Sequence, residues 1–392
     1  MSLTELSAGF IPLVDAAPLI VAQEIGFARE EGLDLVLRKA ASWSALRDHL
    51  ALGQVDAAHM LAPVPVAAAL GLGGVARPLE ALSLLSVNGN VIGVSVEMAS
   101  RMRAAGHDFG FDDARAAGTA LMAASERQIR IGVPFPFSMH AELVYHWLNA
   151  IGVAAPQSVS VRTVPPPLMA KAMEAGEIDA FCVGEPWGSI AVENGVGELL
   201  LPGAAIWSFA PEKVLATRQG WAEEHRDLAF RLIRALWRAG RWLDSIDNRL
   251  IATELLSRPD YLNLPPIVLE RALTGQIVVS SRGETRKVEN FVEFHRGVAG
   301  FPWRSQAVWI ATRLAARTGL DRAEAAAAAR AVFRSDLYRE ALQGTGADLP
   351  GASEKLEGAI ADPTAVASQS GTLILPRNQF FDGTIFDPYD IS

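Results

Sequence analysis

An internal repeat is the feature of this 392-residue sequence that most restricts its fold. The pentapeptides Gly-Gln-Val-Asp-Ala at 53–57 and Gly-Glu-Ile-Asp-Ala at 176–180 share one pattern, and each lies between a helix pattern and an apolar strand pattern. Two further glycines that end helix patterns, Gly32 and Gly152, are separated by a similar interval of about 120 residues. Strand patterns that alternate with helix patterns are typical of parallel sheets. The sequence therefore predicts two similar α/β lobes.

Both halves are expected to present the same elements in the same order. The first half predicts strands at 9–13, 33–37 and 55–58 and helices from 19 and at 43–52; the second predicts strands at 131–133, 159–162 and 178–181 and helices at 139–150 and 168–174. Each opening strand leads through a loop, at 15–18 or 134–138, into a helix. Ligands of open α/β sheets lie beyond the carboxyl ends of strands, where helices begin. Two helix N-termini facing one another there favour an anion.

The rest of the chain has a different character. Helix patterns dominate at 222–243 and in the alanine-rich segment 321–333. The segment from 347 onward is rich in Gly, Pro, Asp and Ser and is expected to be a loop-like tail. Phe380, Phe381 and Phe386 are expected to hold this tail against the body of the protein.

Composition excludes several classes of function. The net charge of −9 disfavours general binding to nucleic acid, which rewards Lys/Arg surfaces. The single cysteine, Cys182, permits no intrachain disulfide and no cysteine-based zinc site, and we expect it to pack in the core. No secretory-signal pattern is visible, because the first basic residue is Arg29. We therefore expect either a cytoplasmic protein or a trimmed mature form, without membrane insertion.

Several polar residues are candidates for binding an anion. Ser138 and His140 begin a helix pattern, where His140 is either a donor to an anion or a capping and packing residue. By default Lys213 is a solvated surface lysine and Trp43 is a core residue. The alternative positive charges are Arg162 and Arg218.

Several stretches resemble the nitrate- and bicarbonate-binding proteins of the NrtA/CmpA type. They are Gly-Phe-Ile-Pro-Leu at 9–13, Asp-Ala-Ala-Pro-Leu at 15–19, Ala-Ser-Trp at 41–43, Asp-Ala-Ala-His-Met-Leu-Ala-Pro at 56–63, Pro-Phe-Ser-Met-His at 136–140, Phe-Cys-Val-Gly-Glu-Pro-Trp at 181–187, Pro-Glu-Lys at 211–213 and Phe-Pro-Trp-Arg-Ser at 301–305. The resemblance covers roughly residues 8–320. It implies an α/β type II periplasmic-binding-protein-like fold, with two lobes, a ligand cleft between them, and a helical C-terminal part packed on lobe I.

In these terms, we predict that lobe I comprises residues 1–88 and 208–345 and that lobe II comprises residues 89–207. Residues 346–392 then form a tail packed on the body. Hinges are expected near 88–91, where Asn-Gly-Asn predicts a turn, and near 206–211. An anion that bridges the lobes shifts such a hinge toward the closed state.

The resemblance also implies a ligand set for a small oxyanion. By motif these residues are Trp43, Asn90, His140 and Lys213, with Asn90 standing where the family has glutamine and thus offering a shorter amide. Further residues expected to line the cleft are Pro18, Ser138, Gly184 and Glu185. The bicarbonate-binding branch has an acidic residue in place of Lys213 and uses calcium. Lys213 therefore indicates nitrate or nitrite, without metal or other cofactor.

Three functions are consistent with the resemblance. We favour a cytoplasmic nitrate/nitrite sensor similar to NasS, which holds a NasT-like RNA-binding antiterminator and releases it when the anion binds, because no signal pattern is visible. The alternative is the substrate-binding component of a nitrate ABC transporter, with a permease as partner. A second alternative is an enzyme on the same fold, of the thiamine-precursor or C–S-cleaving type, using a reactive Cys182.

Overall fold

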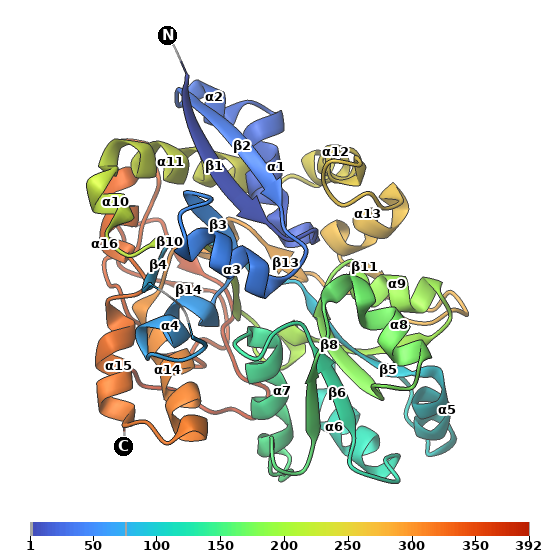
Figure 1. Ribbon diagram of the computed structural model, residues 1–392. Coiled ribbons are helices and arrows are strands. Elements are labelled where there is room, and N and C mark those ends of the chain that lie inside the picture. Colours follow the sequence, from blue (N-terminus) through green and yellow to red (C-terminus); the bar gives the residue numbers. More distant parts are fainter. Residues whose placement is uncertain (1–2, 75–76, 392) are drawn as a thin grey trace.

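Two separate β-sheets organise the chain in the computed structural model, which describes residues 3–74 and 77–391 (Figure 1). The six-stranded sheet has the order β13-β4-β10-β3-β1-β2, and the five-stranded sheet has the order β7-β6-β8-β5-β9. The strands of the first are β1 Thr4–Phe10, β2 Leu33–Lys39, β3 Ala57–Leu61, β4 Leu79–Asn88, β10 Pro211–Arg218 and β13 Val292–Glu293. Those of the second are β5 Asn90–Ser95, β6 Arg130–Val133, β7 Ser160–Thr163, β8 Ala180–Gly184 and β9 Gly197–Pro202. The predicted two-lobed α/β architecture is thus confirmed.

The sequence repeat has a structural basis in the two parallel strand triplets. Strand β1 pairs in parallel with β2 and β3, and β6 pairs in the same way with β7 and β8. Asp56 accepts a hydrogen bond from the backbone N–H of Ser7 at 2.9 Å, and Asp179 accepts one from that of Arg130 at 2.9 Å. In both repeats the aspartate therefore fixes the start of the third strand against the first.

Helices cover both sheets. Those of lobe I are α1 Ala17–Glu24, α2 Phe27–Glu30, α3 Trp43–Ala51 and α4 Pro63–Ala69, with the 3-10 turn η1 Val14–Ala16 after β1. Those of lobe II are α5 Val96–Ala104, α6 Ala114–Ala123, α7 Met139–Ala150, α8 Met169–Glu174 and α9 Trp187–Glu193, with η2 Pro166–Leu168 and η3 Gly203–Ala205. The strand predicted at 9–13 instead ends at Phe10, because the chain turns at Pro12, which has no N–H for a sheet ladder.

The chain crosses between the sheets twice. It passes directly from β4 to β5 through Asn88 and Gly89, both with positive φ, and it returns through residues 203–210 between β9 and β10. Asn88 connects the two crossings, because its Nδ2 donates to Ser208 O and its Oδ1 accepts from Ala210 N, each at 3.0 Å. The crossings fall where we predicted the lobe limits and hinges, which remain predictions. Residues 1, 2, 75, 76 and 392 of the predicted ranges lie outside the described residues.

The helical C-terminal part packs on lobe I, as predicted. Its helices are α10 Trp221–Glu224, α11 Arg226–Trp242, α12 Ile246–Ser257, α13 Pro266–Thr274, α14 Arg304–Thr318, α15 Arg322–Arg330 and α16 Ser335–Ala341, with η4 Arg296–Val298 and the hairpin of β11 Gln276–Val278 and β12 Thr285–Lys287. Helix α11 packs on α1 and α2, and α14 packs on α4 and α15. The helix predicted over 222–243 is interrupted at His225, whose backbone is not helical.

The tail after α16 is mostly irregular, with a small hairpin of β14 Thr364–Ala365 and β15 Ile374–Leu375. Phe380 is buried, and its ring lies 4.6 Å from that of Trp207 and 5.8 Å from that of Trp309. Phe381 and Phe386 are only partly buried against the same core. The prediction that aromatic residues hold the tail against the body is therefore confirmed most clearly for Phe380.

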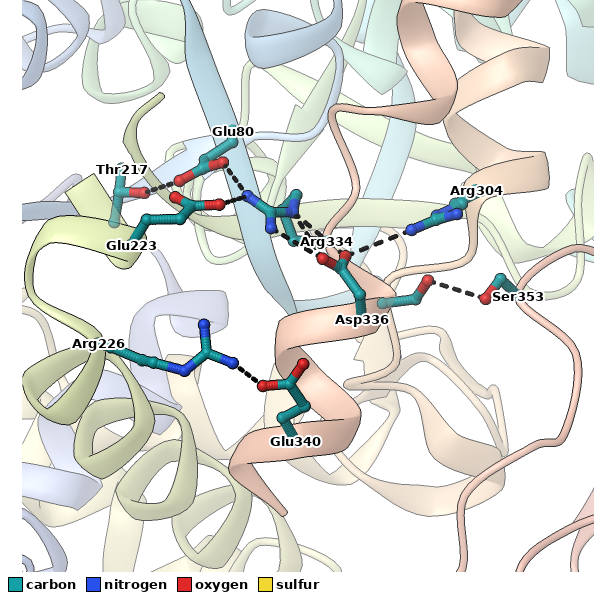
Figure 2. Close-up of polar contacts among 10 residues, drawn as sticks. Glu80, Thr217, Glu223, Arg226, Arg304, Arg334, Asp336, Glu340 and Ser353 are labelled. Carbon is teal, nitrogen blue, oxygen red and sulfur yellow. Dashed lines mark hydrogen bonds and ion pairs between the residues drawn. The ribbon is translucent and has the colours of Figure 1, made fainter. Parts of the chain in front are cut away.

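An ion-pair cluster centred on Arg334 connects α16 to the large sheet (Figure 2). The Arg334 guanidinium lies 2.7 Å from Glu80 Oε2 in β4 and 2.8 Å from Asp336 Oδ2 in α16, and it also contacts Glu223 in α10. Glu80 is the most buried member and additionally accepts from Thr217 Oγ1 at 3.4 Å. The cluster thus connects three elements that are far apart in sequence.

Candidate functional site

Six buried polar side chains from both lobes meet in one cluster. Lobe I supplies Asp15 from η1, His59 from β3 and the neighbours Glu212 and Lys213 from β10; lobe II supplies Asn90 from β5 and His140 from the first turn of α7. Each of them is at most 1% exposed. Such a concentration of buried polar groups is costly unless they pair or bind a ligand.

Among the residues that the structure describes, Lys213 is the only one whose contacts bring a positive charge into this cluster. Its Nζ lies 2.7 Å from Asp15 Oδ2, 2.8 Å from Glu212 Oε1 and 5.5 Å from the centre of the Trp43 ring. The default interpretation of a solvated surface lysine is therefore wrong, because β10 is an interior strand of the large sheet, between β4 and β3. Burial lowers the pKa of Lys213, but the charges of Asp15 and Glu212 outweigh burial and raise it. The ammonium group is charged.

Glu212 joins the two lobes. Its Oε2 accepts a hydrogen bond from Asn90 Nδ2 at 2.7 Å, and its Oε1 lies 3.2 Å from His140 Nδ1. Burial raises the pKa of Glu212, although the charge of Lys213 opposes the rise. One carboxylate of lobe I therefore contacts both lobe II residues that we predicted to bind the anion.

Asp15 and His59 form the second half of the cluster. His59 Nε2 lies 2.9 Å from Asp15 Oδ1, and the His59 ring lies 5.6 Å from the Trp43 ring. Burial would raise the pKa of Asp15, but the charge of Lys213 and the hydrogen bond from His59 lower it overall. Burial lowers the pKa of His59, and burial together with the charge of Lys213 lowers that of His140 well below its usual value. Both imidazoles are thus neutral at neutral pH.

Four polar atoms in or beside the cluster have neither a hydrogen bond nor an ion-pair contact among the described residues: Trp43 Nε1, His59 Nδ1, Asn90 Oδ1 and His140 Nε2. The indole nitrogen of Trp43 can only donate, and a neutral imidazole nitrogen can donate or accept. A buried donor without a partner costs about 1–3 kcal/mol. The arrangement therefore favours a small ligand that accepts hydrogen bonds.

The residues predicted to line the cleft have different positions. Gly184 borders the cluster, because a Cβ built on it would lie 3.6 Å from His140 Nε2 and 3.7 Å from Asp15 Oδ2. Ser138 is the N-cap of α7 and accepts from Ala141 N at 3.2 Å, which fixes the turn that carries His140. Glu185 points toward α9, where it accepts from Ser189 N. Pro18, in the first turn of α1, lines a separate cavity with Ile233 and Trp237, and its place at the cleft stays a prediction.

The alternative positive charges do not reach the cluster. Arg218 lies at the far end of β10, where it donates to Leu50 O at 3.0 Å and to Val55 O at 2.8 Å. Arg162 lies in β7, at the edge of the smaller sheet, and is exposed. Lys213 therefore remains the cation best placed to face an anion.

Direct contacts between the lobes surround the cluster. The backbone N–H of Val14 donates to Glu185 O at 3.0 Å, and Trp187 Nε1 donates to Pro12 O at 2.9 Å. Together with the contacts of Glu212, these bonds hold the lobes against one another next to the charged residues. A ligand therefore reaches the cluster only when the lobes separate.

Cys182 lies in β8 and is a free, buried cysteine, as predicted. Burial, with a contribution from the charge of Glu212, raises the pKa of its thiol well above the usual value. The thiolate is the reactive form of cysteine. We therefore expect iodoacetamide to leave Cys182 unmodified in the native protein and to alkylate it stoichiometrically in denaturant, as followed by intact-mass spectrometry. Rapid alkylation of the native protein would contradict this expectation and favour a reactive thiol.

Neither a metal site nor a membrane span is apparent in residues 3–74 and 77–391. They contain no group of three or more His, Cys, Asp or Glu side chains arranged to hold a metal ion. None of the helices in this part of the chain is both long enough and apolar enough to cross a membrane.

Sequence reasoning named Trp43, Asn90, His140 and Lys213, and the structure brings all four to the same cluster. It did not assign Asp15, His59 or Glu212, although each lies within a motif that carried the resemblance. A signal was present for two of them: Asp15 and His59 are each an ionisable residue within an otherwise apolar segment, which is typical of buried functional groups.

The fold and the sealed polar cluster define a two-lobed binding protein of the periplasmic-binding type. The NMT1-like family model matches residues 2–257, and the chain belongs to this family. Within it, the chain is similar to the nitrate/nitrite binding protein NrtA of Nostoc sp. (strain PCC 7120), at 30% identity over 98% of this chain and 83% of the relative. It is also similar to the bicarbonate-binding protein CmpA of Synechococcus elongatus, at 28% identity over 98% of this chain and 84% of the relative.

The structural comparison agrees. The crystal structure of the periplasmic nitrate-binding protein NrtA from Synechocystis PCC 6803 matches with a TM-score of 0.83 and 28% identity, covering 99% of this chain and 96% of that chain. The nitrate import ATP-binding protein NrtC of Synechocystis is 32% identical over 79% of this chain, but the chain spans only 45% of its length. The relatives matched over most of their length are binding proteins, in agreement with the prediction of a binding protein and not an enzyme.

Proposed function

We propose that this protein binds nitrate or nitrite between its lobes as the substrate-binding component of an ABC-type importer. The observation that carries the proposal is the sealed cluster, in which Lys213 lies beside the unpartnered nitrogens of Trp43 and His140. Nitrate is a planar, weakly basic anion, so it requires one cation, a few donors and a dry wall. Relatives named for nitrate and for an import system support this choice.

Lys213 favours nitrate or nitrite over bicarbonate with calcium. A calcium ion takes six to eight oxygen ligands, and a buried ammonium group beside Asp15 and Glu212 occupies the place of such a cation. Each charge-assisted hydrogen bond contributes about 1.5–3 kcal/mol net. Three or four of them, less the cost of ordering the lobes, correspond to an affinity of roughly 1 μM.

The sensor function favoured from the sequence gains no support from the comparisons, because no relative named above is a regulator. The same holds for a cytoplasmic location: the matched solved relative is named as periplasmic. We therefore prefer the transport function, with a periplasmic location and a permease as partner. A NasT-like partner remains the alternative, and it predicts capture of an RNA-binding protein in the absence of nitrate.

Isothermal titration calorimetry with nitrate and nitrite, in the presence of a calcium chelator, tests the proposal. We expect binding of at least one of them with a Kd of roughly 1 μM. Absence of binding to both at every pH between about 6 and 8 would exclude the assignment.

His140→Ala is expected to weaken nitrate binding at least about tenfold, because it removes a donor worth about 1.4 kcal/mol or more from a dry site. Calorimetry measures the change. His225→Ala is the matched control, since His225 is exposed and lies next to α11, away from the cluster. If the two variants bind nitrate equally well, His140 is not a ligand.

A further inference from the structure

Glu212 contacts three of the four residues predicted to bind the anion. Its Oε1 pairs with Lys213 Nζ and lies near His140 Nδ1, and its Oε2 accepts from Asn90 Nδ2. The carboxylate therefore competes with an incoming anion for the lysine and the amide. A site proposed to bind an anion therefore contains a carboxylate that occupies the same donors, and the role of this carboxylate has to be explained.

The charges of the cluster also disfavour the binding of an anion. Among the described residues, Asp15 and Glu212 face a single cation, Lys213, while burial keeps His59 and His140 neutral. The cluster therefore carries one excess negative charge before any ligand enters. A second excess negative charge in a dry site costs several kcal/mol, so a bare anion is poorly held unless one carboxylate gains a proton.

Glu212 is the carboxylate better suited to gain that proton. Asp15 has two partners, Lys213 and His59, and its pKa is lowered overall. Burial instead raises the pKa of Glu212, whose other contacts are the neutral side chains of Asn90 and His140. Protonation of Glu212 also breaks its ion pair with Lys213, so that the ammonium group becomes free to face the ligand.

We infer that Glu212 determines which oxyanions the site accepts. When an oxyanion without a hydroxyl group binds, the Glu212 carboxylate takes up one proton from solvent. When the oxyanion itself carries a hydroxyl group, the carboxylate remains ionised. Nitrate belongs to the first kind, and nitrate plus a proton leaves the charge of the cluster unchanged. Hydrogencarbonate belongs to the second kind, because its O–H can donate to the ionised carboxylate. The inference rests on the proposed function, which it deepens.

Other groups that face Glu212 do not supply the proton site. They are Lys213 on β10, Asp15 on η1, His140 on α7, Asn90 on β5 and Cys182 on β8. Lys213 and the Cys182 thiol stay protonated at neutral pH, because both pKa values are raised. The pKa values of Asp15 and His140 are lowered, so neither group takes up a proton readily at neutral pH. Glu185 is the other candidate in this region, since burial raises its pKa to about 7, but its carboxylate faces Ser189 and Gly188 in α9.

Calorimetry in two cationic buffers of different ionisation enthalpy, Tris and bis-Tris, counts the protons bound with each anion. For nitrate we expect uptake of about one proton, so that Kd rises about tenfold per pH unit between about pH 6 and 8. The direction follows from linkage, because a complex that binds more protons than the free protein is favoured as pH falls. For hydrogencarbonate, titrated in sealed cells at about pH 8, we expect binding without net proton uptake.

Glu212→Gln keeps the volume of the side chain and removes its charge. We expect this variant to bind nitrate without proton uptake and with a Kd independent of pH. We expect it to bind hydrogencarbonate more weakly, relative to nitrate, than the wild type does. Glu185→Gln is the matched control, a second buried carboxyl in the same region that should retain the proton uptake of the wild type. Even if Glu212→Gln does not fold, absence of proton uptake in the wild type, or its loss in Glu185→Gln, would overturn the role of Glu212.

The outcomes separate this inference from the proposed function. Nitrate binding without proton uptake by the wild type, or proton uptake retained in Glu212→Gln, would overturn the role of Glu212 and leave nitrate binding standing. No binding of nitrate or nitrite at any pH would overturn the proposed function itself. Failure of hydrogencarbonate to bind would contradict the acceptor role of the ionised carboxylate.

Discussion

Replacing Lys213 with methionine is expected to abolish measurable nitrate binding and to lower the free energy of unfolding by roughly 3–5 kcal/mol. Binding is lost because Lys213 carries the cluster's positive charge, and without it an anion would enter a site that holds two carboxylates. Stability falls because Asp15 and Glu212, both fully buried, lose the cation that compensates them. Calorimetry with nitrate measures the first effect and urea denaturation the second.

A double variant separates these two effects. Lys213→Met combined with Glu212→Gln removes one of the two uncompensated carboxylates, while Asp15 keeps its contact with His59. We expect the double variant to recover part of the lost stability, because removing both members of a buried pair costs less than removing one. Nitrate binding should not recover, since the cation is still absent. Wild-type affinity in the single variant would show that Lys213 does not contact the anion.

The repeated fold could be predicted from the sequence because the interaction that causes the repeat is local. Asp56 and Asp179 each lie just before a strand and accept from the backbone of the first strand of their lobe. The same hydrogen bond in both lobes leaves the same short pattern in both halves of the sequence. The break at His225 could not be predicted, because residues 223–227 contain neither glycine nor proline to mark the end of a helix.

The candidate site was only partly predictable. Neighbouring residues of a strand point to opposite faces, so a pattern places Glu212 and Lys213 on different sides of β10. The register of β10 against β4 shifts on both sides of Lys213, and such an irregularity redirects side chains. Both residues therefore reach one cluster. This arrangement depends on how β10 pairs with a strand that is distant in sequence, so the local pattern does not predict it. The role of these residues as ligands remains a prediction.

Arg334→Met is expected to lower the free energy of unfolding by roughly 3–5 kcal/mol, because it leaves Glu80 buried without its cation. Glu80 is 3% exposed, whereas the other two carboxylates of the cluster, Glu223 and Asp336, reach water and tolerate the loss (Figure 2). Urea denaturation at about pH 7 measures the change. Lys287→Met is the control: it breaks an exposed pair with Glu289, and its effect should stay below about 0.5 kcal/mol.

The effect of Arg334→Met should also depend on pH. Burial already raises the pKa of Glu80 in the folded protein, and removal of Arg334 removes the main interaction that opposes the rise. A carboxyl group whose folded-state pKa lies above its unfolded value destabilises the protein above the folded pKa and ceases to do so below the unfolded pKa. The variant's deficit should therefore shrink as pH falls from about 7 to about 5. Adding Glu80→Gln should restore stability and remove this pH dependence; a deficit equal at both pH values would mean that lost packing, and not the uncompensated charge, causes it.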